Sequence, residues 1–384
     1  MEEKKNIPKL RFPEFTGEWE QRKLGEVTKE LSEYDNFSSG LPLLTSARTG
    51  LMYQSDYRGN TTTDNENTLF SVVPLNACTY RHMSDDSTFH LNINTLEKGL
   101  VSKEYPVFVE NESNLKFIVP YINSSSSFTK FCSEQKKGGT RTRLYYKTLC
   151  EYQMMMPLLD EQNKIADYFT NLDNLITLHQ RKLELLEKQK KAVMQAIFSR
   201  KVRFKKEDGS DFTEWEEKSL DDLLQYEQPT KYLVSSTDYK DEYKTPVLTA
   251  GQSLILGYTD ETNGIYEASE VNPVIIFDDF TTSYHWIDFP FKVKSSAMKM
   301  LTMKTDDVFE YVYFAMGSID YRPTSHSRQW ISTYSQLTIP MPHKDEQKLI
   351  ADFLTSFDEA IATAREEFAK WKELRKGLLQ QMFV

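Results

Sequence analysis

A pattern written twice constrains this chain more than any other feature of its sequence. The segment "LRFPEFTGEWEQRKLGEV" at 10–27 has a counterpart in "VRFKKEDGSDFTEWEEKSLDDL" at 202–223, each with Arg-Phe, a turn, Phe-Thr, Glu-Trp-Glu and a Leu. Further on, "PLLDEQNKIADYFTNLDNLI" at 157–176 matches "MPHKDEQKLIADFLTSFDEAI" at 341–361. Because both ends of the pattern recur in the same order, the sequence predicts an internal repeat of two copies.

The spacing between the copies shows where they differ in length. Trp19 and Trp215 are 196 positions apart, whereas Asp160 and Asp345 are 185 apart, so the middle of the second copy is eleven residues shorter. The Trp residues, with Phe15 and Phe212, are interpreted as apolar staples that fasten the start of each copy onto the structure.

Each copy closes with a segment typical of a long helix. Alternating steps of four and three residues along each segment meet almost only apolar side chains. The walk from 165 has two polar exceptions and the walk from 350 has one, so each segment carries a sustained heptad stripe. The two stripes are Ile165, Phe169, Leu172, Ile176, His179, Leu183, Leu186, Lys190, Val193, Ile197, and Ile350, Leu354, Phe357, Ile361, Ala364, Phe368, Trp371, Arg375, Leu378, Met382. We expect the two helices to cover each other's stripe in a two-helix coiled coil.

The direction of that coiled coil is predicted from its charged seam residues. Lys190 and Arg375 occupy the same seam position at an offset of 185, so a parallel in-register pair would place like charges face to face. Antiparallel packing separates them and puts His179 and Ala364 near the middle. It would also place the two globular parts at opposite ends of the coiled coil. Parallel packing is the less favoured alternative.

Between these ends, each copy contains short apolar runs separated by turns. The runs, interpreted as short strands, are "FSVVPL", "YPVFVE" and "LKFIVPYI" in the first copy and "NPVIIF", "FKVKS" and "VFEYVYFAM" in the second. The predicted fold class is α/β, with two globular mixed α/β domains, a long antiparallel two-helix coiled coil and a pseudo-twofold repeat.

Composition limits the class of protein. The 384 residues exceed the usual size of one hydrophobic core, three cysteines make no even disulfide framework, and no uncharged apolar run approaches the roughly 18 residues of a membrane span. The start "MEEKKNIPKL" has no apolar region behind its charges, so a cytoplasmic protein without membrane contact is expected.

The charge is unevenly placed along the chain. Residues 1–150 hold 19 Lys+Arg and 19 Asp+Glu; of 47 basic and 57 acidic residues, 28 and 38 therefore fall in 151–384 and supply the net charge of −10. The segment "KFCSEQKKGGTRTRLYYK" at 130–147 carries six bases and one acid. A local basic patch is thus compatible with an acidic average.

Corresponding loops in the two copies carry residue types that reach phosphates and base edges. "LPLLTSARTG" at 41–50 matches "TPVLTAGQS" at 245–253, and Arg143 matches Arg328 at the offset of 185. Asp278 or Asp279 could accept from a cytosine amino group. The alternatives are an ordinary solvated turn for the basic loop, salt bridges for the arginines, and turn-forming roles for the aspartates.

Other chemistry finds little support. Cys78, His82, His90 and Cys132 lack the C-x-x-C spacing of a zinc site, and the chain has no phosphate-binding G-x-x-x-x-G-K-[ST] loop. "NPVI" at 272–275 is not the Asn-Pro-Pro-aromatic motif of amino-methyltransferases. We therefore predict no catalytic and no metal site, although a scattered set of nuclease carboxylates stays open.

With these residues in view, the chain is similar to the specificity (S) subunits of Type I restriction-modification enzymes. The resemblance rests on "KLRFPEFTGEWEQRKLGEV" before an α/β domain, "PLLDEQNKIADYF" opening a long helix, and a second round ending in "KGLLQQMF". It implies a first target recognition domain at 1–156, a long helix at 157–200, a second target recognition domain at 201–341 and a second long helix at 342–384.

The resemblance also implies function and partners. Each target recognition domain would read one half of a bipartite double-stranded DNA site. The coiled coil would set their spacing and bind two methyltransferase (M) subunits, with motor-nuclease (R) subunits joining the full complex. The chain would be non-catalytic and hold no cofactor, because S-adenosylmethionine would belong to M and ATP with Mg to R. Divergent domains imply different half-sites.

By the same resemblance, loop residues become DNA-contact candidates. They are Arg48, Thr49, Arg81, Lys136, Lys137, Thr140, Arg141, Arg143, Gln252, Asp278, Thr281, Thr282, Tyr284, His285, Ser327 and Arg328. Two other classes stay open: a self-contained endonuclease with duplicated DNA-binding domains, and a coiled-coil adaptor that joins two protein-binding domains.

Overall fold

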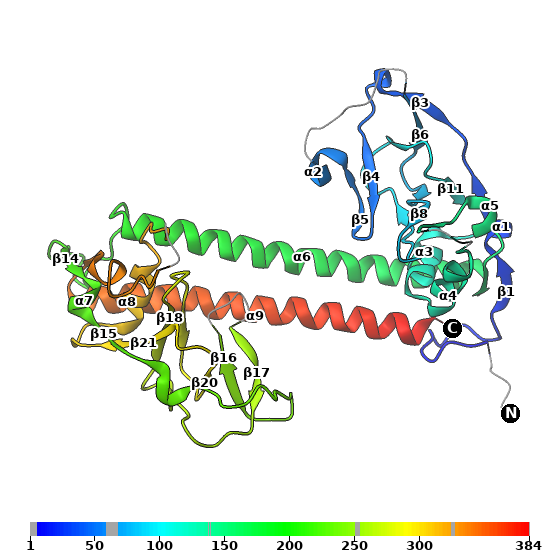
Figure 1. The fold of residues 1–384 in the computed structure, drawn as a ribbon. Helices are drawn as coiled ribbons and strands as arrows, with labels where there is room; N and C mark the ends of the chain where they lie inside the picture. The colour runs from blue at the N-terminus through cyan, green and yellow to red at the C-terminus, as the bar shows by residue number, and fades with distance from the viewer. Residues whose placement is uncertain are drawn as a thin grey trace. The chain divides into compact units, whose positions relative to one another are not determined.

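The computed structural model describes residues 6–58, 68–136, 138, 140–249, 254–323 and 327–383. The chain forms two compact units, one of residues 1–181 with 366–384 and the other of residues 182–365 (Figure 1). Each unit therefore contains one mixed α/β domain and a part of each of the two long helices, α6 (Leu159–Phe198) and α9 (Lys344–Met382).

The domain of the first unit is built from short strands and helices. Its elements are β1 (Glu20–Lys23), α1 (Leu24–Val27), β2 (Thr28–Glu30), β3 (Tyr34–Asn36), η1 (Phe37–Ser39), β4 (Leu44–Ala47), β5 (Gly50–Tyr53), α2 (Gln54–Arg58), β6 (Leu69–Val73), β7 (Cys78–Thr79), β8 (Met83–Ser84), β9 (Asn92–Ile93), β10 (Gly99–Ser102), β11 (Val107–Glu110), α3 (Leu115–Ser124), α4 (Ser126–Glu134), β12 (Thr142–Arg143), α5 (Tyr146–Leu149) and β13 (Gln153–Met156). The strand orders are β2-β11-β7-β9 and β10-β6-β3, with pairs β1-β13, β4-β5 and β8-β12.

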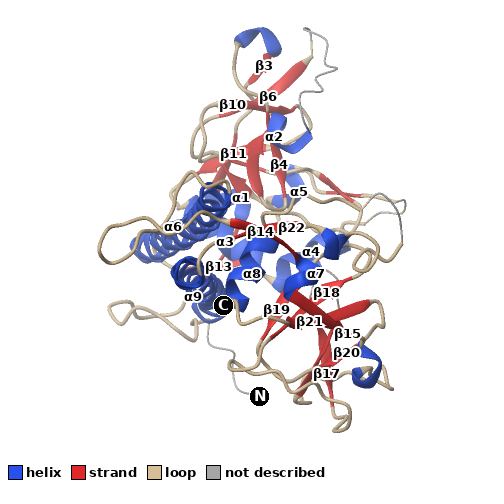
Figure 2. Ribbon diagram, turned by 90° about the vertical axis from the view of Figure 1, so that its left-hand side faces the viewer, coloured by secondary structure: helices blue, strands red, loops and turns tan. Residues whose placement is uncertain are grey.

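The domain of the second unit follows a similar plan with fewer elements. They are β14 (Glu216–Ser219), α7 (Leu220–Leu223), β15 (Leu224–Glu227), η2 (Pro229–Tyr232), β16 (Thr245–Leu248), β17 (Ile255–Thr259), β18 (Val274–Asp278), β19 (Tyr284–Ile287), β20 (Lys292–Val293), β21 (Met298–Met303), α8 (Phe309–Met316), η3 (Tyr334–Gln336) and β22 (Thr338–Met341). The orders are β15-β21-β18-β19 and β17-β16-β20, with the pair β14-β22. Figure 2 shows the mixture of short strands and helices in both domains.

The two domains repeat the same frame. In each, a strand after the Glu-Trp-Glu motif pairs antiparallel with the strand that leads into the long helix, β1 with β13 and β14 with β22. A one-turn helix follows the first of these strands, and a four-stranded sheet begins directly after it. The predicted mixed α/β class and internal repeat are thus confirmed.

The long helices run antiparallel within each unit. In the first unit His179 lies against Trp371, with ring centroids 5.8 Å apart, and Asp173 pairs with Arg375. In the second unit Glu187 pairs with Arg365 and Lys190 with Asp358. In both cases a later residue on α6 meets an earlier residue on α9, which confirms antiparallel pairing. Every position of the two predicted stripes is buried or half-buried.

Each domain closes its main core on helix ends. In the first unit the buried cluster contains Trp19, Phe169 near the start of α6 and Met382 near the end of α9. In the second it contains Trp215, Ile350 near the start of α9 and Ile197 near the end of α6. Apolar residues of the stripes at the helix ends therefore also belong to the hydrophobic core of each domain.

Two segments interpreted as strands are helices. "LKFIVPYI" lies in α3, where the Asn114 side chain accepts from Lys116 N at the N-cap, and "VFEYVYFAM" lies mostly in α8, whose preceding Val308 N donates to Gln347 Oε1. Each run carries a single charged residue, Lys116 or Glu310, so the sequence offers too few polar positions to mark a helical face. The strand interpretation holds for parts of the other four runs, in β6, β11, β18 and β20.

Candidate nucleic-acid interface

A buried glutamate anchors the start of each copy to its long helix. In the first copy Arg11 binds Glu161 with two contacts of 2.7 Å, and Trp19 Nε1 lies 3.4 Å from the same carboxylate. In the second, Arg203 Nη2 lies 2.9 Å and Trp215 Nε1 3.0 Å from Glu346 Oε2. Of the four predicted staples, the two tryptophans are therefore polar anchors as well as apolar ones.

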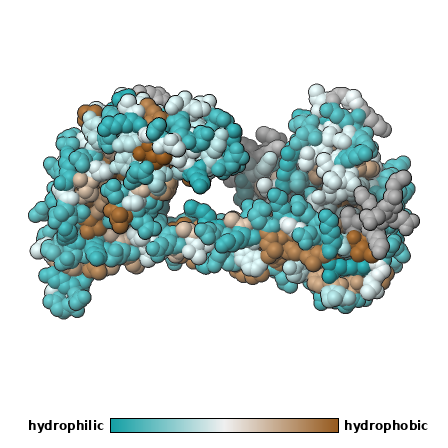
Figure 3. Space-filling model, turned by 90° about the horizontal axis from the view of Figure 1, so that it is seen from below, coloured by the Kyte–Doolittle hydropathy of each residue, from teal (hydrophilic) through white to brown (hydrophobic). Residues whose placement is uncertain are grey.

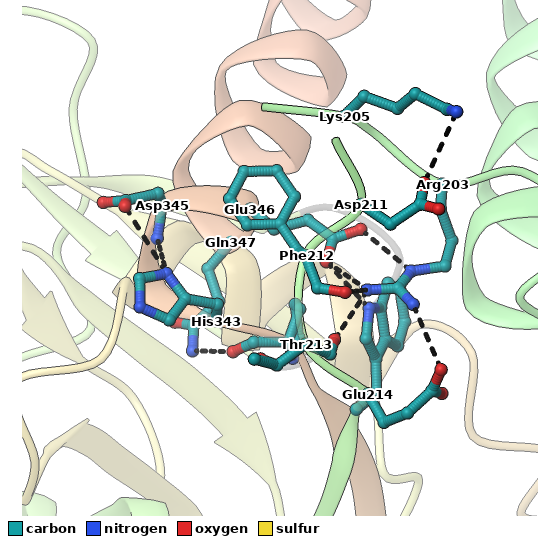
Figure 4. Close-up of polar contacts among 12 residues, drawn as sticks. Arg203, Lys205, Asp211, Phe212, Thr213, Glu214, His343, Asp345, Glu346 and Gln347 are labelled. Atoms are coloured by element: carbon teal, nitrogen blue, oxygen red, sulfur yellow. Dashed lines mark hydrogen bonds and ion pairs between the residues drawn. The ribbon is translucent and has the colours of Figure 1, made fainter. Parts of the chain in front are cut away.

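Figure 4 shows this anchor in the second copy. The guanidinium of Arg203 points toward Glu346 and also donates to the carbonyl oxygen of Thr213, 2.8 Å away. Glu346 is fully buried, so Arg203 and Trp215 replace water as the hydrogen-bond donors to its carboxylate. The anchor explains why Arg-Phe, Glu-Trp and Asp-Glu-Gln recur together in the sequence.

The glutamine beside each anchor fixes the next element. Gln162 Oε1 accepts from Asn114 N and its Nε2 donates to Pro157 O; Gln347 Oε1 accepts from Val308 N and its Nε2 donates to Pro342 O. Each glutamine thereby ties the residue at the start of α3 or α8 to the start of a long helix. The candidate loops are carried on this fixed frame.

Several first-domain candidates surround one depression of about 410 Å³. Arg48, Thr49 and Arg81 line it, together with Asp85 and Asp86. Arg48 and Thr49 form the two-residue turn between β4 and β5, and the Arg48 Nη2 lies 2.6 Å from each oxygen of Asp86. All three candidates are exposed.

The basic segment after α4 reaches the same place through strand pairing. β12 pairs with β8, which places Arg143 opposite Met83 on the rim of the depression. Arg141 Nε lies 2.8 Å from Asp85 Oδ1, and both arginines are exposed. Lys136 and Thr140 are exposed in the preceding connection, whereas Lys137 lies outside the described residues.

The local electrostatics favour an ionised Asp86 and neutral His82 and His90 beside the arginines. Hydrogen bonds from Ser84 and Arg48 hold the pKa of Asp86 well below its ordinary value, so this carboxylate is ionised at neutral pH. Burial lowers the pKa of His82 and of His90, so both rings are predominantly neutral there. The depression thus presents guanidinium groups held by two carboxylates.

In the second domain the turn between β18 and β19 collects most candidates. Asp278 Oδ1 accepts from Phe280 N and Thr281 N, which is the turn-forming role considered as its alternative. Thr282 adopts a positive φ of 60°, and Thr281 is exposed. Tyr284 packs on Tyr313, with ring centroids 5.4 Å apart, and burial raises its pKa.

A second segment lies beside this turn. Gln329 N and Trp330 N both donate to Asp279, to its carbonyl oxygen and to Oδ1, each over 2.8 Å. The exposed candidates Ser327 and Arg328 immediately precede these donors. His285 is half-buried and its pKa is lowered by burial, while Gln252 lies outside the described residues.

Sequence reasoning missed Asp85 and Asp86 as partners of the first-domain loops, and Asp279, considered as an acceptor for a cytosine amino group, is instead fully buried against Lys299. Asp85, Asp86 and the buried ion pair of Asp279 with Lys299 organise the segments that carry the candidates. The only available signal was their position beside basic or turn residues, as in "RHMSDDS" and "FDDF". Whether the candidates touch DNA stays a prediction.

Two further findings concern metals and membranes. Within the described parts of the chain, no group of three or more His, Cys, Asp or Glu side chains is arranged to hold a metal ion. Nor does any helix there combine the length and apolar character needed to cross a bilayer.

The fold and loops define a class of duplicated proteins in which each mixed α/β domain closes on long helices and carries exposed polar loops with a matched arginine, Arg143 or Arg328. Sequence comparison gives this class a family. A model of the Type I restriction modification DNA specificity domain matches residues 83–188 and 213–370. The chain belongs to this family.

Individual relatives agree with that assignment. The EcoR124I/EcoR124II specificity subunit of Escherichia coli is 55% identical over 130 residues, 33% of this chain and 32% of that protein. The MjaVIII specificity subunit of Methanocaldococcus jannaschii is 23% identical over 331 residues, 75% of this chain and 74% of the relative. The matched part thus spans about a third of the first relative's length.

One solved structure supports the fold. The S subunit of a Type I restriction-modification system from M. genitalium has a TM-score of 0.64 to this chain at 14% identity, with 98% of this chain and 99% of that chain covered. At this identity the likeness concerns the fold.

Proposed function

We propose that this chain is the DNA-recognition subunit of a Type I restriction-modification complex. Each α/β domain would read one half of a bipartite double-stranded DNA site through the exposed loops described above. The observation that carries the proposal is the duplicated anchor, Glu161 with Arg11 and Glu346 with Arg203. It gives two differently decorated domains one common attachment to the helices, as a reader of two different half-sites requires.

The helices would serve as the docking surface for two methyltransferase subunits. Large apolar side chains are exposed on α6 and α9, including Leu178, Leu185 and Leu374, and Figure 3 shows apolar surface along part of the paired helices. Exposed apolar surface of this kind favours a protein partner. Because the frame is duplicated, it would present two equivalent binding surfaces, one for each of two identical M subunits.

The chemistry of modification and restriction would reside in the partners. S-adenosylmethionine would bind to the M subunits, and ATP with Mg to motor-nuclease subunits in the full complex. The residues of this chain would contribute recognition, with arginines on bases and lysines on phosphates. Family membership favours this reading over a self-contained endonuclease or a protein adaptor.

The direct test is the methylome of cells that express this chain with its cognate M subunit. We expect one bipartite motif whose halves differ in sequence and are separated by a fixed gap. Cells with M alone serve as the control and should lack the motif. DNA cleavage by the purified chain with a divalent metal would support the endonuclease instead, and absence of any motif with M present would support the adaptor.

A further inference from the structure

A fully buried ion pair lies beneath the candidate loops of the second domain. Lys299 Nζ is 3.3 Å from Asp279 Oδ2, and neither side chain is exposed to solvent. Asp279 directly follows β18, and Lys299 belongs to the neighbouring strand β21, where it lies opposite Phe277. Moving two charges out of water is costly, and apolar residues of similar size often stabilise a fold as well as a buried ion pair does. Stability alone therefore does not account for the pair.

The contacts of Asp279 indicate that role. Its Oδ1 accepts from Trp330 N and its carbonyl oxygen accepts from Gln329 N, so one residue holds two consecutive amides of the Arg328 segment. Its neighbour Asp278 caps the adjoining turn through the amides of Phe280 and Thr281. Two consecutive aspartates therefore hold two candidate loops side by side.

Lys299 fixes the carboxylate that makes these contacts. Its Nζ lies 5.2 Å from the centroid of the Tyr226 ring, and among the described residues it has no hydrogen-bond acceptor. Asp279 Oδ2 likewise has no hydrogen-bond donor within the described part of the chain. The ammonium group thus faces one oxygen, which leaves the other oxygen directed at Trp330 N.

The first domain has a buried polar residue at the matching position. The strand ladders align Cys78 on β7 with Ile275 on β18. In the first domain the third residue of β2 pairs with β11, whose residue there pairs with Cys78; in the second domain the third residue of β15 pairs with β21, whose residue there pairs with Ile275. Four residues further on stand His82 and Asp279. His82 is 3% exposed, and its Nδ1 has no hydrogen-bond partner among the described residues.

The backbone contacts repeat at this matching position. The carbonyl oxygen of His82 accepts from Leu144 N over 2.9 Å, as that of Asp279 accepts from Gln329 N, and the two donors are 185 positions apart. Arg143 and Arg328 directly precede these donors. Each domain therefore ties its arginine segment to the residue at this matching position, which is His82 in the first domain and Asp279 in the second.

We infer that Asp279 and Lys299 are positioning residues for the second half-site: their buried pair holds the Arg328 segment against the turn at 278–283 so that both address the same bases. The inference rests on the proposed function, since it assumes that these loops read DNA. It assigns the pair to specificity rather than to folding. Its effect should be confined to one half of the motif.

The test compares methylomes and site-specific methylation rates of the complete chain with its M subunit. The double variant Asp279→Asn/Lys299→Met removes both charges and keeps an oxygen for Trp330 N. We expect it to fold, to relax discrimination in the second half-site or slow methylation on the order of tenfold, and to leave the first half-site unchanged. The unchanged half also shows that M remains active.

A matched control removes a comparable pair from the same domain. Lys292 Nζ is 2.9 Å from Glu261 Oε2, with side chains 4% and 18% exposed, and this pair holds the segment at Ser235 and Ser236 instead. Lys292→Met/Glu261→Gln should leave both half-sites as they are. Lys299→Arg, which keeps the charge, should retain more discrimination than the double variant.

The outcomes separate the inference from the function. A wild-type complex without any bipartite motif contradicts the proposed function itself. A folded Asp279→Asn/Lys299→Met complex that methylates the unchanged motif at the wild-type rate overturns only the inference. If that variant does not fold, Asp279→Asn/Lys299→Leu is used in its place, because it also removes both buried charges and keeps the oxygen for Trp330 N. If neither folds while the control pair does, the role is in folding and the inference is wrong.

Discussion

The guanidinium of Arg375 on α9 binds the carboxylate of Asp173 on α6, with Nη2 3.0 Å from Oδ2. The second unit repeats this pair at the offset of 185, because Lys190 Nζ lies 2.5 Å from Asp358 Oδ1. Each charged seam residue therefore has its own acidic partner on the opposite helix. This relationship explains physically why the like-charged seam residues favour the antiparallel direction.

Reversing one of these charges should loosen the second unit. We expect Asp358→Lys to place two lysines together and cost about 1 kcal/mol, a fall in Tm of about 2–4 °C, since the pair is partly exposed. The exchange Lys190→Asp/Asp358→Lys should recover most of the loss. Thermal unfolding of the full chain measures both, with Glu359→Lys as an exposed neighbouring control. An unchanged Tm for Asp358→Lys would contradict the assignment.

Removing the anchor charge should cost more than the seam change. Glu346→Gln keeps the size of the side chain but deprives Arg203 and Trp215 of a buried anionic acceptor, which we expect to cost about 1–3 kcal/mol. Glu214→Gln is the matched control, because Glu214 is 94% exposed and 4.0 Å from Arg203. Denaturant titration compares the two variants. Equal stability of both would show that the anchor is dispensable.

The Lys292–Glu261 pair predicts a specific pH dependence. The hydrogen bond from Lys292 lowers the pKa of Glu261 from 4.5 to about 2. A lowered folded-state pKa means that the stabilisation is complete above about pH 4.5 and is lost as the pH falls toward 2. The Tm difference between the wild type and Glu261→Gln should therefore be larger at about pH 7 than at about pH 3. A constant difference would contradict the pair's contribution.

The two matched arginines should act on different half-sites. We expect Arg143→Ala to relax one base position of the first half and Arg328→Ala one of the second, each at a cost of about 1–3 kcal/mol in affinity.

Lys136→Ala should instead weaken all sites alike and reduce the salt dependence of binding. Binding of the complex to a panel of duplexes measures these effects. Arg22→Ala, whose side chain pairs with Glu26, is the surface control. An unchanged motif and affinity for Arg143→Ala would remove that residue from the interface.

Sequence periodicity predicted the features that depend on local pattern. The Asp-Glu-Gln motifs stand at the starts of α6 and α9, and the stripes from Ile165 and Ile350 became the helix seam. The antiparallel direction followed from two seam charges. The helices at α3 and α8 could not be recognised, because residues such as Ile118 and Val312 are buried within apolar runs that carry only one charged residue each.

The candidate interface could be predicted only in part, because its geometry joins distant segments. Residue type singled out Arg48 and Arg141, but their contacts with Asp86 and Asp85 depend on the pairing of β8 with β12 and on the turn between β4 and β5. Lys299 gave no signal of its own, since a lysine in a strand normally faces solvent. Its role became visible only through burial against Asp279.

The most direct test of two independent readers is exchange of residues 25–150 for the same segment of another family member. The exchange leaves β1 and β13, which frame the first domain, and the anchor of Arg11 with Glu161 intact. The methylome of the hybrid with the cognate M subunit should show one half of the motif replaced and the other half, with the gap, retained. Changes in both halves, or in neither, would contradict the account.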